Sequence, residues 1–360
     1  MSPQTKQVLN VGKAQLDLLE ELTNANGVSG NEIEIREIIR KKVAPFVDEI
    51  NVDGMGNLLV IKHAKKPNAI KVMLDAHMDE VGFMIVEEDG DGLYEFEHVG
   101  GGDERQFVSK PVSVGSQKLP GVIGSKPIHL ASEDEMNAVI SQQGMRIDLG
   151  PAGKGKAKRG DYAAYATKFI RSGDAIFAKA LDNRLGCATL IELLKTAPEH
   201  VELLAAFTVQ EEIGLRGAKV AAYDFYPQLA IAVDSTPAFD FERPDGNENT
   251  QYNCKLGGGP AIYIADRGTL SDPRLIRFLT EVAEENKINY QYRQPGGGGT
   301  DAGALHLTRG GVPSVSVSVP GRYAHTAVML ARISDWQDTL NLLQQALEAL
   351  TPEILSGDRA

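Results

Sequence analysis

The stretch Ile70-Lys71-Val72-Met73-Leu74-Asp75-Ala76-His77-Met78-Asp79-Glu80 begins as an apolar run and ends in acidic residues and a histidine. Such a short apolar run, bounded by turn residues, predicts a strand buried in a sheet. Similar runs occur at 203–208, 229–233 and 314–317, and each leads into Asp, Glu or His. Ligands of open α/β sheets bind at the carboxyl ends of the strands. These segments therefore indicate both the fold and the location of a functional site.

Helical and strand patterns alternate around these runs, which is typical of an α/β protein. The first forty-odd residues have the spacing of two helices. Later helices are expected at 184–196, 217–223, 273–286, 302–307 and 336–350, and further strands at 58–61 and 261–264. We therefore predict an α/β fold with a mixed, mostly parallel sheet and helices on both of its faces.

The sequence pattern is different between about residue 82 and residue 173. Short alternating stretches such as Tyr94-Glu95-Phe96-Glu97 lie between glycine turns, and no long helical pattern occurs. This pattern predicts a small all-β unit, and its length of about 90 residues is within the usual range for a domain. We expect one α/β domain formed by residues 1–83 and 174–360, with a β-rich domain at 84–173 inserted into it.

The composition excludes several classes of protein. The chain has 360 residues, a formal net charge of −12 and only two cysteines, Cys187 and Cys254. An acidic chain is poorly suited to nucleic acid, because that affinity depends on neutralising phosphates. Residues 1–12 lack the apolar core of a secretory signal, and no run of about 18 apolar residues suggests a membrane span. We expect a cytoplasmic protein with no nucleic-acid or membrane partner.

Five predicted strand or helix ends supply metal-ligating side chains, namely His77, Asp182, Glu211 with Glu212, Asp234 and His325. Each has a simpler explanation when taken alone. Asp182 could cap a helix, Asp234 could begin an Asx turn, and His325 could be an ordinary surface histidine. The coincidence of all five at successive strand ends is harder to explain by turn chemistry. Imidazole and carboxylate together form a ligand set for a divalent cation such as zinc, cobalt or manganese.

The number of ligand candidates favours two metal ions. A single catalytic zinc usually takes three protein ligands and a water molecule. Five candidates remain here even if one glutamate acts as a base, and one carboxylate bridging two ions would complete three bonds to each. In His77-x-Asp79 the alternate residues share one side of an extended chain, so the carboxylate could fix the orientation of a ligating imidazole.

The sequence, with these residues in this order, resembles the family of glutamyl and deblocking aminopeptidases. Its tetrahedral members are called TET aminopeptidases, and some relatives carry a cellulase label. The resemblance extends from about residue 16 to residue 350 and rests on the motifs His77-x-Asp79-Glu80, Leu181-Asp182-Asn183-Arg184, Glu211-Glu212-Ile213-Gly214, Asp234, Gly298-Gly299-Thr300-Asp301-Ala302-Gly303 and Arg322-Tyr323-Ala324-His325. It implies a zinc-peptidase-like fold and removal of N-terminal residues from peptide substrates.

The resemblance also implies roles for individual residues. His77 and Asp234 would hold one metal ion, Glu212 and His325 the second, and Asp182 would bridge them. Glu211 would serve as general base and acid, and Asp79 would orient His77. The glycine-rich loop with Gly299, Thr300 and Asp301 would line the substrate pocket, although a tight turn before a helix explains it equally well. The β-rich insertion would mediate dimerisation, within a homo-oligomer that is a dimer or a dodecamer.

Three alternatives to an aminopeptidase share parts of this pattern. A dimetal amidohydrolase of small N-acyl amino acids would need the same ions and base, and differs only in substrate recognition. A glycoside hydrolase needs two carboxyl groups on opposite sides of a sugar, and the adjacent Glu211 and Glu212 do not suit that geometry. A scaffold protein without activity would have no need of a complete ligand set together with its base.

Overall fold

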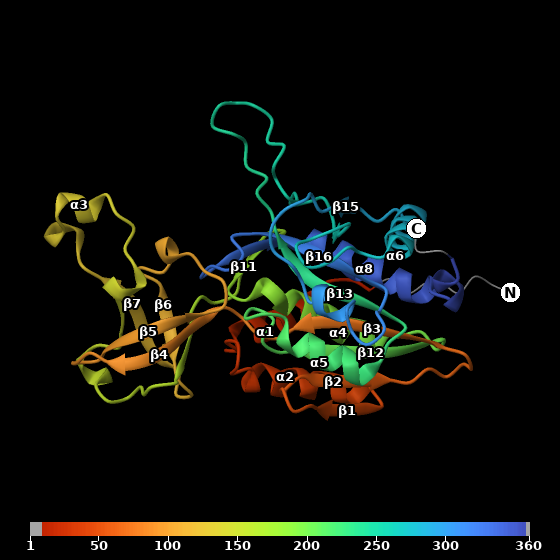
Figure 1. Cartoon of the computed structure of the whole chain (residues 1–360), viewed down its shortest axis with the longest axis horizontal. Helices are drawn as coiled ribbons and strands as arrows, with labels where there is room; N and C mark the ends of the chain where they lie inside the picture. The colour runs from red at the N-terminus through yellow and green to blue at the C-terminus, as the bar shows by residue number, and fades with distance from the viewer. Residues whose placement is uncertain (1–8, 358–360) are drawn as a thin grey trace.

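The structure is a computed structural model that describes residues 9–357. Part of the N-terminal stretch in which no secretory signal is expected therefore lies outside the described residues. Figure 1 shows a larger body of strands and helices beside a smaller body made mainly of strands. Among the described helices, none combines the length and the apolar character that crossing a bilayer would require.

The larger body is built on an 11-stranded sheet. Its main path runs, in spatial order, through β1 (Glu49–Val52), β2 (Leu58–Lys62), β12 (Val201–Thr208), β3 (Ile70–His77), β13 (Leu229–Pro237), β16 (Ser314–Arg322), β17 (Met329–Arg332), β11 (Ala175–Ala178) and β10 (Ile170–Ser172). Off this path, β14 (Ala261–Ile262) pairs with β16 and with β15 (Gln291–Tyr292). The predicted mixed α/β sheet is confirmed.

Parallel pairing is concentrated in the centre of this sheet. Strands β12, β3, β13 and β16 pair in parallel, whereas β1, β2, β17, β11 and β10 pair antiparallel at the two sides. The expectation of mostly parallel pairing thus holds for the central strands only. Short strands joined by tight connections, such as β1 to β2 and β10 to β11, must run antiparallel because a parallel crossover needs a dozen or more residues.

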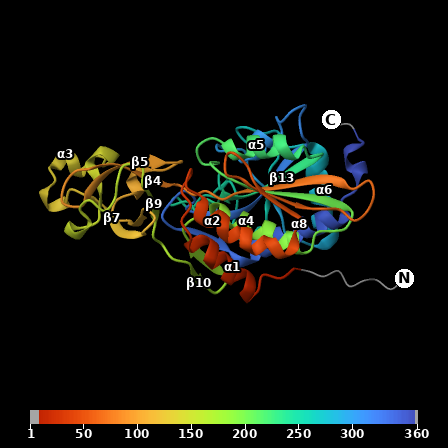
Figure 2. The same cartoon turned by 90° about the horizontal axis from the view of Figure 1, so that it is seen from below.

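Side chains alternate between the two faces of the central strands. Val72 and Leu74 belong to one buried cluster, whereas Met73 between them belongs to another. The first face is covered by α1 (Lys13–Asn24), α2 (Ile33–Val43), α4 (Leu181–Lys195), α6 (Pro273–Asn286) and α8 (Ile333–Ala349). The opposite face is covered by α5 (Arg216–Phe225) and α7 (Ala302–Leu305). Figure 2 shows α5 on one side of the sheet and α1, α2, α4 and α8 on the other.

The smaller body is a closed antiparallel barrel with its own buried cluster. Its strands, in spatial order, are β4 (Gly82–Glu88), β5 (Leu93–Val99), β8 (Met145–Asp148), β7 (Leu119–Ser125), β6 (Pro111–Val114) and β9 (Tyr162–Tyr165). A short helix, α3 (Glu133–Met136), lies in the excursion between β7 and β8. Strand β10 at 170–172 already belongs to the large sheet, so the range 84–173 expected for the insertion includes one strand of the other body.

One long connection leaves the large sheet between β13 and β14. It projects away from both bodies in Figure 1, and residues 239–250 in it form no helix or strand. Asp240 at its base accepts a hydrogen bond from Arg322 Nε at 2.6 Å, and the Arg322 guanidinium lies 4.7 Å from the Phe241 ring centroid. This ion pair ties the start of the projecting connection to the end of β16.

Candidate metal centre

The first group of metal-ligating side chains lies in the middle of the sheet. His77 ends β3, and Asp234 lies on the neighbouring parallel strand β13. His77 Nε2 is 3.5 Å from Asp234 Oδ1 and 3.2 Å from Asp182 Oδ1. His77 is 2% exposed and Asp234 6% exposed, so this group is nearly sealed from solvent.

Asp182 occupies the position between the two groups. It lies at the start of α4 with non-helical backbone angles, and its two carboxylate oxygens face different histidines. The N-cap alternative for Asp182 does not hold, because the capping hydrogen bond is made by the next residue. Asn183 Oδ1 accepts it from Gly186 N at 3.0 Å. The Asp182 carboxylate is therefore free to face the site.

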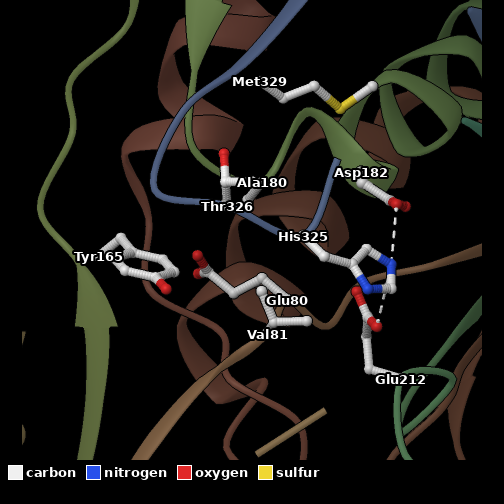
Figure 3. A pocket seen from close by; sticks show the side chains of 9 residues that line it. All are labelled: Glu80, Val81, Tyr165, Ala180, Asp182, Glu212, His325, Thr326 and Met329. Atoms are coloured by element: carbon white, nitrogen blue, oxygen red, sulfur yellow. Dashed lines mark ion pairs between the residues drawn. The ribbon is translucent and has the colours of Figure 1, made fainter. Parts of the chain in front are cut away.

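The second group consists of Asp182, Glu212 and His325. His325 Nε2 is 3.5 Å from Asp182 Oδ2 and 3.4 Å from Glu212 Oε2, and Figure 3 shows the imidazole between these two carboxylates. Glu212 follows β12 and His325 follows β16, so both lie on turns beyond strand ends. The ligand atoms within each group lie within 4.8 Å of one another, and Asp182 belongs to both groups.

Asp79 supports both groups from behind. Its Oδ1 is 3.6 Å from His77 Nδ1, and the same carboxylate accepts hydrogen bonds from the backbone N–H groups of Glu211 and Glu212 at 3.0 and 3.2 Å. Ser29 Oγ also donates to it, at 2.6 Å. The sequence predicted only its contact with His77. The backbone carbonyl oxygen of Asp79 accepts a hydrogen bond from His77 Nδ1 at 3.2 Å. Asp79 thus orients a histidine of the first group through its carbonyl and, through its carboxylate, the turn that supplies the second.

The turn at 210–212 has a further support that sequence reasoning missed. Glu32 is 4% exposed and accepts hydrogen bonds from the backbone N–H groups of Gly30 and Gln210. Burial raises the pKa of Glu32 to about 7. No local pattern around Glu32 indicates a contact with a turn so distant along the chain.

The clustered carboxylates give this region a surplus of negative charge, which the shifted pKa values reflect. Burial raises the pKa of Glu212 to about 8 and also raises that of Asp234. Burial opposes the charged form of His77, but Asp182, Asp234 and Asp79 together raise the His77 pKa well above its ordinary value. In the same way, Glu212 and Asp182 outweigh burial and raise the pKa of His325 to about 9. A divalent cation would neutralise this surplus and displace those protons.

Glu211 belongs to neither group of ligand candidates, which leaves its carboxylate available for a different role. It is half-buried on the turn beside the two groups, and burial raises its pKa well above the usual range. The neighbouring charge of His77 acts in the opposite direction on this pKa.

The residues predicted for substrate binding occupy different environments. Gly299 is exposed, whereas Thr300 and Asp301 are 1% and 2% exposed. Thr300 Oγ1 is 2.6 Å from Ser316 Oγ, and Asp301 Oδ2 accepts a hydrogen bond from Thr208 Oγ1 at 2.8 Å. Burial and the charge of Asp301 raise the pKa of Asp75 well above its usual value. Thr300 and Asp301 are thus held inside the fold by these hydrogen bonds, and the glycine part of the loop is exposed.

The barrel also contributes to the wall of the site. Tyr165 of β9 lines a small cavity together with Asp182, Glu212 and His325, as Figure 3 shows. Residues 100–102, here called the glycine strap, follow β5. A Cβ atom at Gly101 would lie 2.9 Å from His325 Nδ1, and one at Gly100 would lie 3.2 Å from Glu212 Cβ. Only glycine permits this close approach, a reason that the sequence alone did not reveal.

Comparison with known proteins identifies the family. The family model described as M42 glutamyl aminopeptidase matches residues 56–342. The chain belongs to this family, which places it among the peptidases. A protein of Acetivibrio thermocellus is 40% identical over 92% of this chain and 98% of its own length. The glutamyl aminopeptidase of Lactococcus lactis is 32% identical over 94% and 97%, and the lysyl aminopeptidase of Pyrococcus furiosus 33% identical over 93% and 97%.

Solved structures agree with this assignment. The aminopeptidase APDkam598 of Desulfurococcus kamchatkensis has a TM-score of 0.89 and 32% identity, covering 95% of this chain and 97% of that one. The TET1 peptidase of Pyrococcus horikoshii, described as assembling into a tetrahedron or a large octahedral shell, has a TM-score of 0.81 and 32% identity, covering 93% and 100%. The predicted resemblance to TET aminopeptidases is confirmed.

Proposed function

We propose that this protein is an aminopeptidase that uses two divalent metal ions to remove N-terminal residues from peptides. The observation that supports it most directly is the pair of three-residue groups that share Asp182. His77 and Asp234 would hold one ion, Glu212 and His325 the other, and Asp182 would bridge them. A shared carboxylate of this kind brings two ions close enough to act on one substrate.

The donor set fits such ions on chemical grounds. Imidazole nitrogen and carboxylate oxygen suit zinc, cobalt or manganese. Asp79 provides, through its backbone carbonyl, the kind of acceptor that commonly orients a ligating histidine. Bound there, two ions would polarise the scissile carbonyl and acidify a water molecule. The metal in the cell is not determined by the ligand set, because all three cations accept these donors.

The residues of the chain would perform the proton transfers. The Glu211 carboxylate would accept a proton from the attacking water and deliver it to the nitrogen of the departing peptide, acting as base and then as acid. Asp79 fixes the Glu211 backbone through the 3.0 Å hydrogen bond and thereby limits where the carboxylate can move.

We also propose that the protein is a homo-oligomer in which the barrel mediates dimerisation. The excursion between β7 and β8 exposes apolar side chains that a second copy could cover, namely Ile128, Leu130, Met136 and Val139, which are 67, 69, 54 and 59% exposed. Light scattering at micromolar concentration tests this role. A monomer would contradict it.

The central test is hydrolysis of aminoacyl-anilides, short peptides and N-acyl amino acids by metal-stripped protein with zinc, cobalt or manganese added back. Metal-dependent release of single N-terminal residues is expected. Cleavage of N-acyl amino acids alone would support the amidohydrolase alternative instead. In Glu211→Gln we expect both ions to remain bound while turnover falls by about 10²–10⁴-fold, the usual contribution of a general base. Near-normal turnover would refute the role of Glu211.

A further inference from the structure

Arg293 is a buried arginine without a carboxylate partner in the described part of the chain. It follows β15, is 5% exposed, and its Nε and Nη1 atoms have no hydrogen-bond partner there. Its Nη2 donates to the carbonyl oxygen of Gly297, and the guanidinium lies 4.7 Å from the centroid of the Tyr263 ring. A buried charge is normally paired, so a lone guanidinium indicates that its partner comes from elsewhere.

The surroundings of Arg293 form a cavity. The cavity is lined by the end of β13, the base of the projecting connection and the loop after β15, with Pro237, Asn253, Arg293 and Gly297 among its walls. Gln294 holds two of these walls together, because its N–H donates to Asn253 O and its Oε1 accepts from Asn253 N. Hydrogen bonds therefore connect the walls of the cavity, which is not a gap between unconnected loops.

One wall of this cavity belongs to the strand that also carries the predicted metal ligand Asp234. Pro237 is three residues beyond Asp234 on β13, a separation of about 10 Å in an extended strand. Tyr263, over which Arg293 lies, donates a hydrogen bond from its hydroxyl to Thr236 Oγ1 at 2.9 Å. One amino-acid residue with its side chain, or a short peptide, can bridge such a distance.

From this arrangement we infer that Arg293 is a specificity-determining residue that binds a carboxylate of the peptide substrate. The inference rests on the proposed aminopeptidase function. The carboxylate could be the side chain of an N-terminal glutamate or aspartate, or the C-terminal group of a short peptide. The relatives do not decide between acidic and basic substrates, since one is named a glutamyl and another a lysyl aminopeptidase. The charge of Arg293 favours an anion because the guanidinium is fixed and largely removed from water.

Matched substrate pairs test this inference with the metal-loaded enzyme. The first pair is the anilides of glutamate and glutamine, which have nearly the same shape and differ in charge. The second pair is the dipeptide Leu-Ala and its C-terminal amide. A preference of about tenfold or more in kcat/KM is expected for the charged member of one pair, and the pair that shows it identifies the source of the carboxylate. The absence of a preference in both pairs would overturn the inference.

Variants of Arg293 test whether this residue causes the preference for the charged substrate. In Arg293→Leu the ratio for the charged and neutral substrates is expected to fall toward one. In Arg309→Leu, which removes an arginine that lies over Tyr223 and Tyr226 and does not line this cavity, the ratio should remain as in the wild type. Should the leucine variant fail to fold, Arg293→Lys retains the charge with a shorter reach and should show a reduced preference. A ratio unchanged in Arg293→Leu or Arg293→Lys would overturn the inference.

Failure of the inference is distinguishable from failure of the proposed function. Metal-dependent hydrolysis of neutral anilides without any preference for a carboxylate would reject the role of Arg293 and leave the aminopeptidase assignment intact. No release of N-terminal residues from any substrate, with any of the metals, would reject the proposed function itself.

Discussion

The two groups that share Asp182 are constructed differently. His77 and Asp234 project from neighbouring strands in the centre of the sheet and are 2% and 6% exposed. Glu212 and His325 lie on turns; the Glu212 side chain is 3% exposed, whereas the His325 side chain is 44% exposed. Gln210 and His325 both have positive φ angles, of 57° and 58°, which residues with a side chain rarely adopt. The first group is positioned by sheet pairing, and the second depends on contacts that hold two unusual turns.

One site can thus contain ligands that the surrounding structure holds in place to different degrees. Strands in a central parallel sheet are fixed on both sides, so the first group needs few additional contacts. The second group depends on Asp79, Glu32 and the glycine strap, residues that hold the turns without belonging to either group. Such supporting residues commonly affect metal affinity by about 10–100-fold. We therefore expect the two groups to respond differently when the protein is perturbed.

The largest effect is expected from Asp182→Asn, because this residue serves both groups. An amide lacks the negative charge that two cations would share, so both should bind at least about 100-fold more weakly. Activity should fall by about 10³-fold or more, equivalent to about 4 kcal/mol. Metal content after gel filtration and initial rates would measure this. Asp91→Asn, a change at an exposed carboxylate on the barrel, is the control, and tight retention of two ions in Asp182→Asn would refute the bridging role.

The next effect is a stepwise loss of metal during chelator titration. The ion of the second group should leave first, at least about tenfold more readily, which corresponds to about 1.4 kcal/mol. Absorption of the cobalt-loaded protein would follow both steps, and His325→Ala should abolish only the weaker one. Release of both ions in one step, or loss of the tighter step in His325→Ala, would contradict the proposed difference between the groups.

A smaller effect is expected from Gly101→Ala. The added methyl group would press against His325 Nδ1 and displace the imidazole, which should weaken binding at the second group by about tenfold and leave the first group unchanged. Titration calorimetry with zinc would measure both affinities. Gly124→Ala is the matched control on the barrel, because its Cβ would approach only Arg146 O, at 3.9 Å. Unchanged affinity of both groups in Gly101→Ala would show that the strap does not position His325.

The last prediction concerns folding stability rather than metal binding, through the pH dependence that Glu32 contributes. Its pKa is raised in the folded protein from 4.5 to about 7, so its stabilising contribution is complete below pH 4.5 and is lost as the pH rises through 7. In Glu32→Gln this loss should disappear, because the amide oxygen can still accept from Gly30 and Gln210. The variant should gain up to about 3 kcal/mol over the wild type between about pH 5 and pH 8. Urea unfolding at both pH values checks this, and an equal difference at the two values would contradict it.

Much of the site was predictable because local sequence determines where a strand ends. Val72-Met73-Leu74 and Ala230-Ile231-Ala232 are apolar on both faces, as a central parallel strand requires, so His77 and Asp234 had to meet at one edge of the sheet. The same reasoning placed the segments containing Glu212 and His325 at that edge. The sequence also predicted a mixed sheet. It did not predict that the strands at the two sides pair antiparallel, because the pairing direction of short strands depends on their connections rather than on composition.

The supporting residues could not be predicted in this way. Glu32 and residues 100–102 reach the site across long separations in sequence, and their types suit ordinary caps and turns equally well. Arg293 resembles any solvated arginine until its burial and its lack of a carboxylate partner among the described residues are known. Burial and long-range contact are properties of the folded chain, so residues that act through them leave little trace in a local pattern.

The position of the barrel has a consequence for folding. It is inserted between Asp79 and Asp182, so the chain must close a loop of about a hundred residues before the first group can form. Barrel folding would shorten that loop in advance, because β4 and β9 pair and bring its two ends together. Contacts between residues distant in sequence form slowly, so the metal centre should be among the last parts of the molecule to assemble. An ion that binds only the assembled centre would then secure the final step of folding.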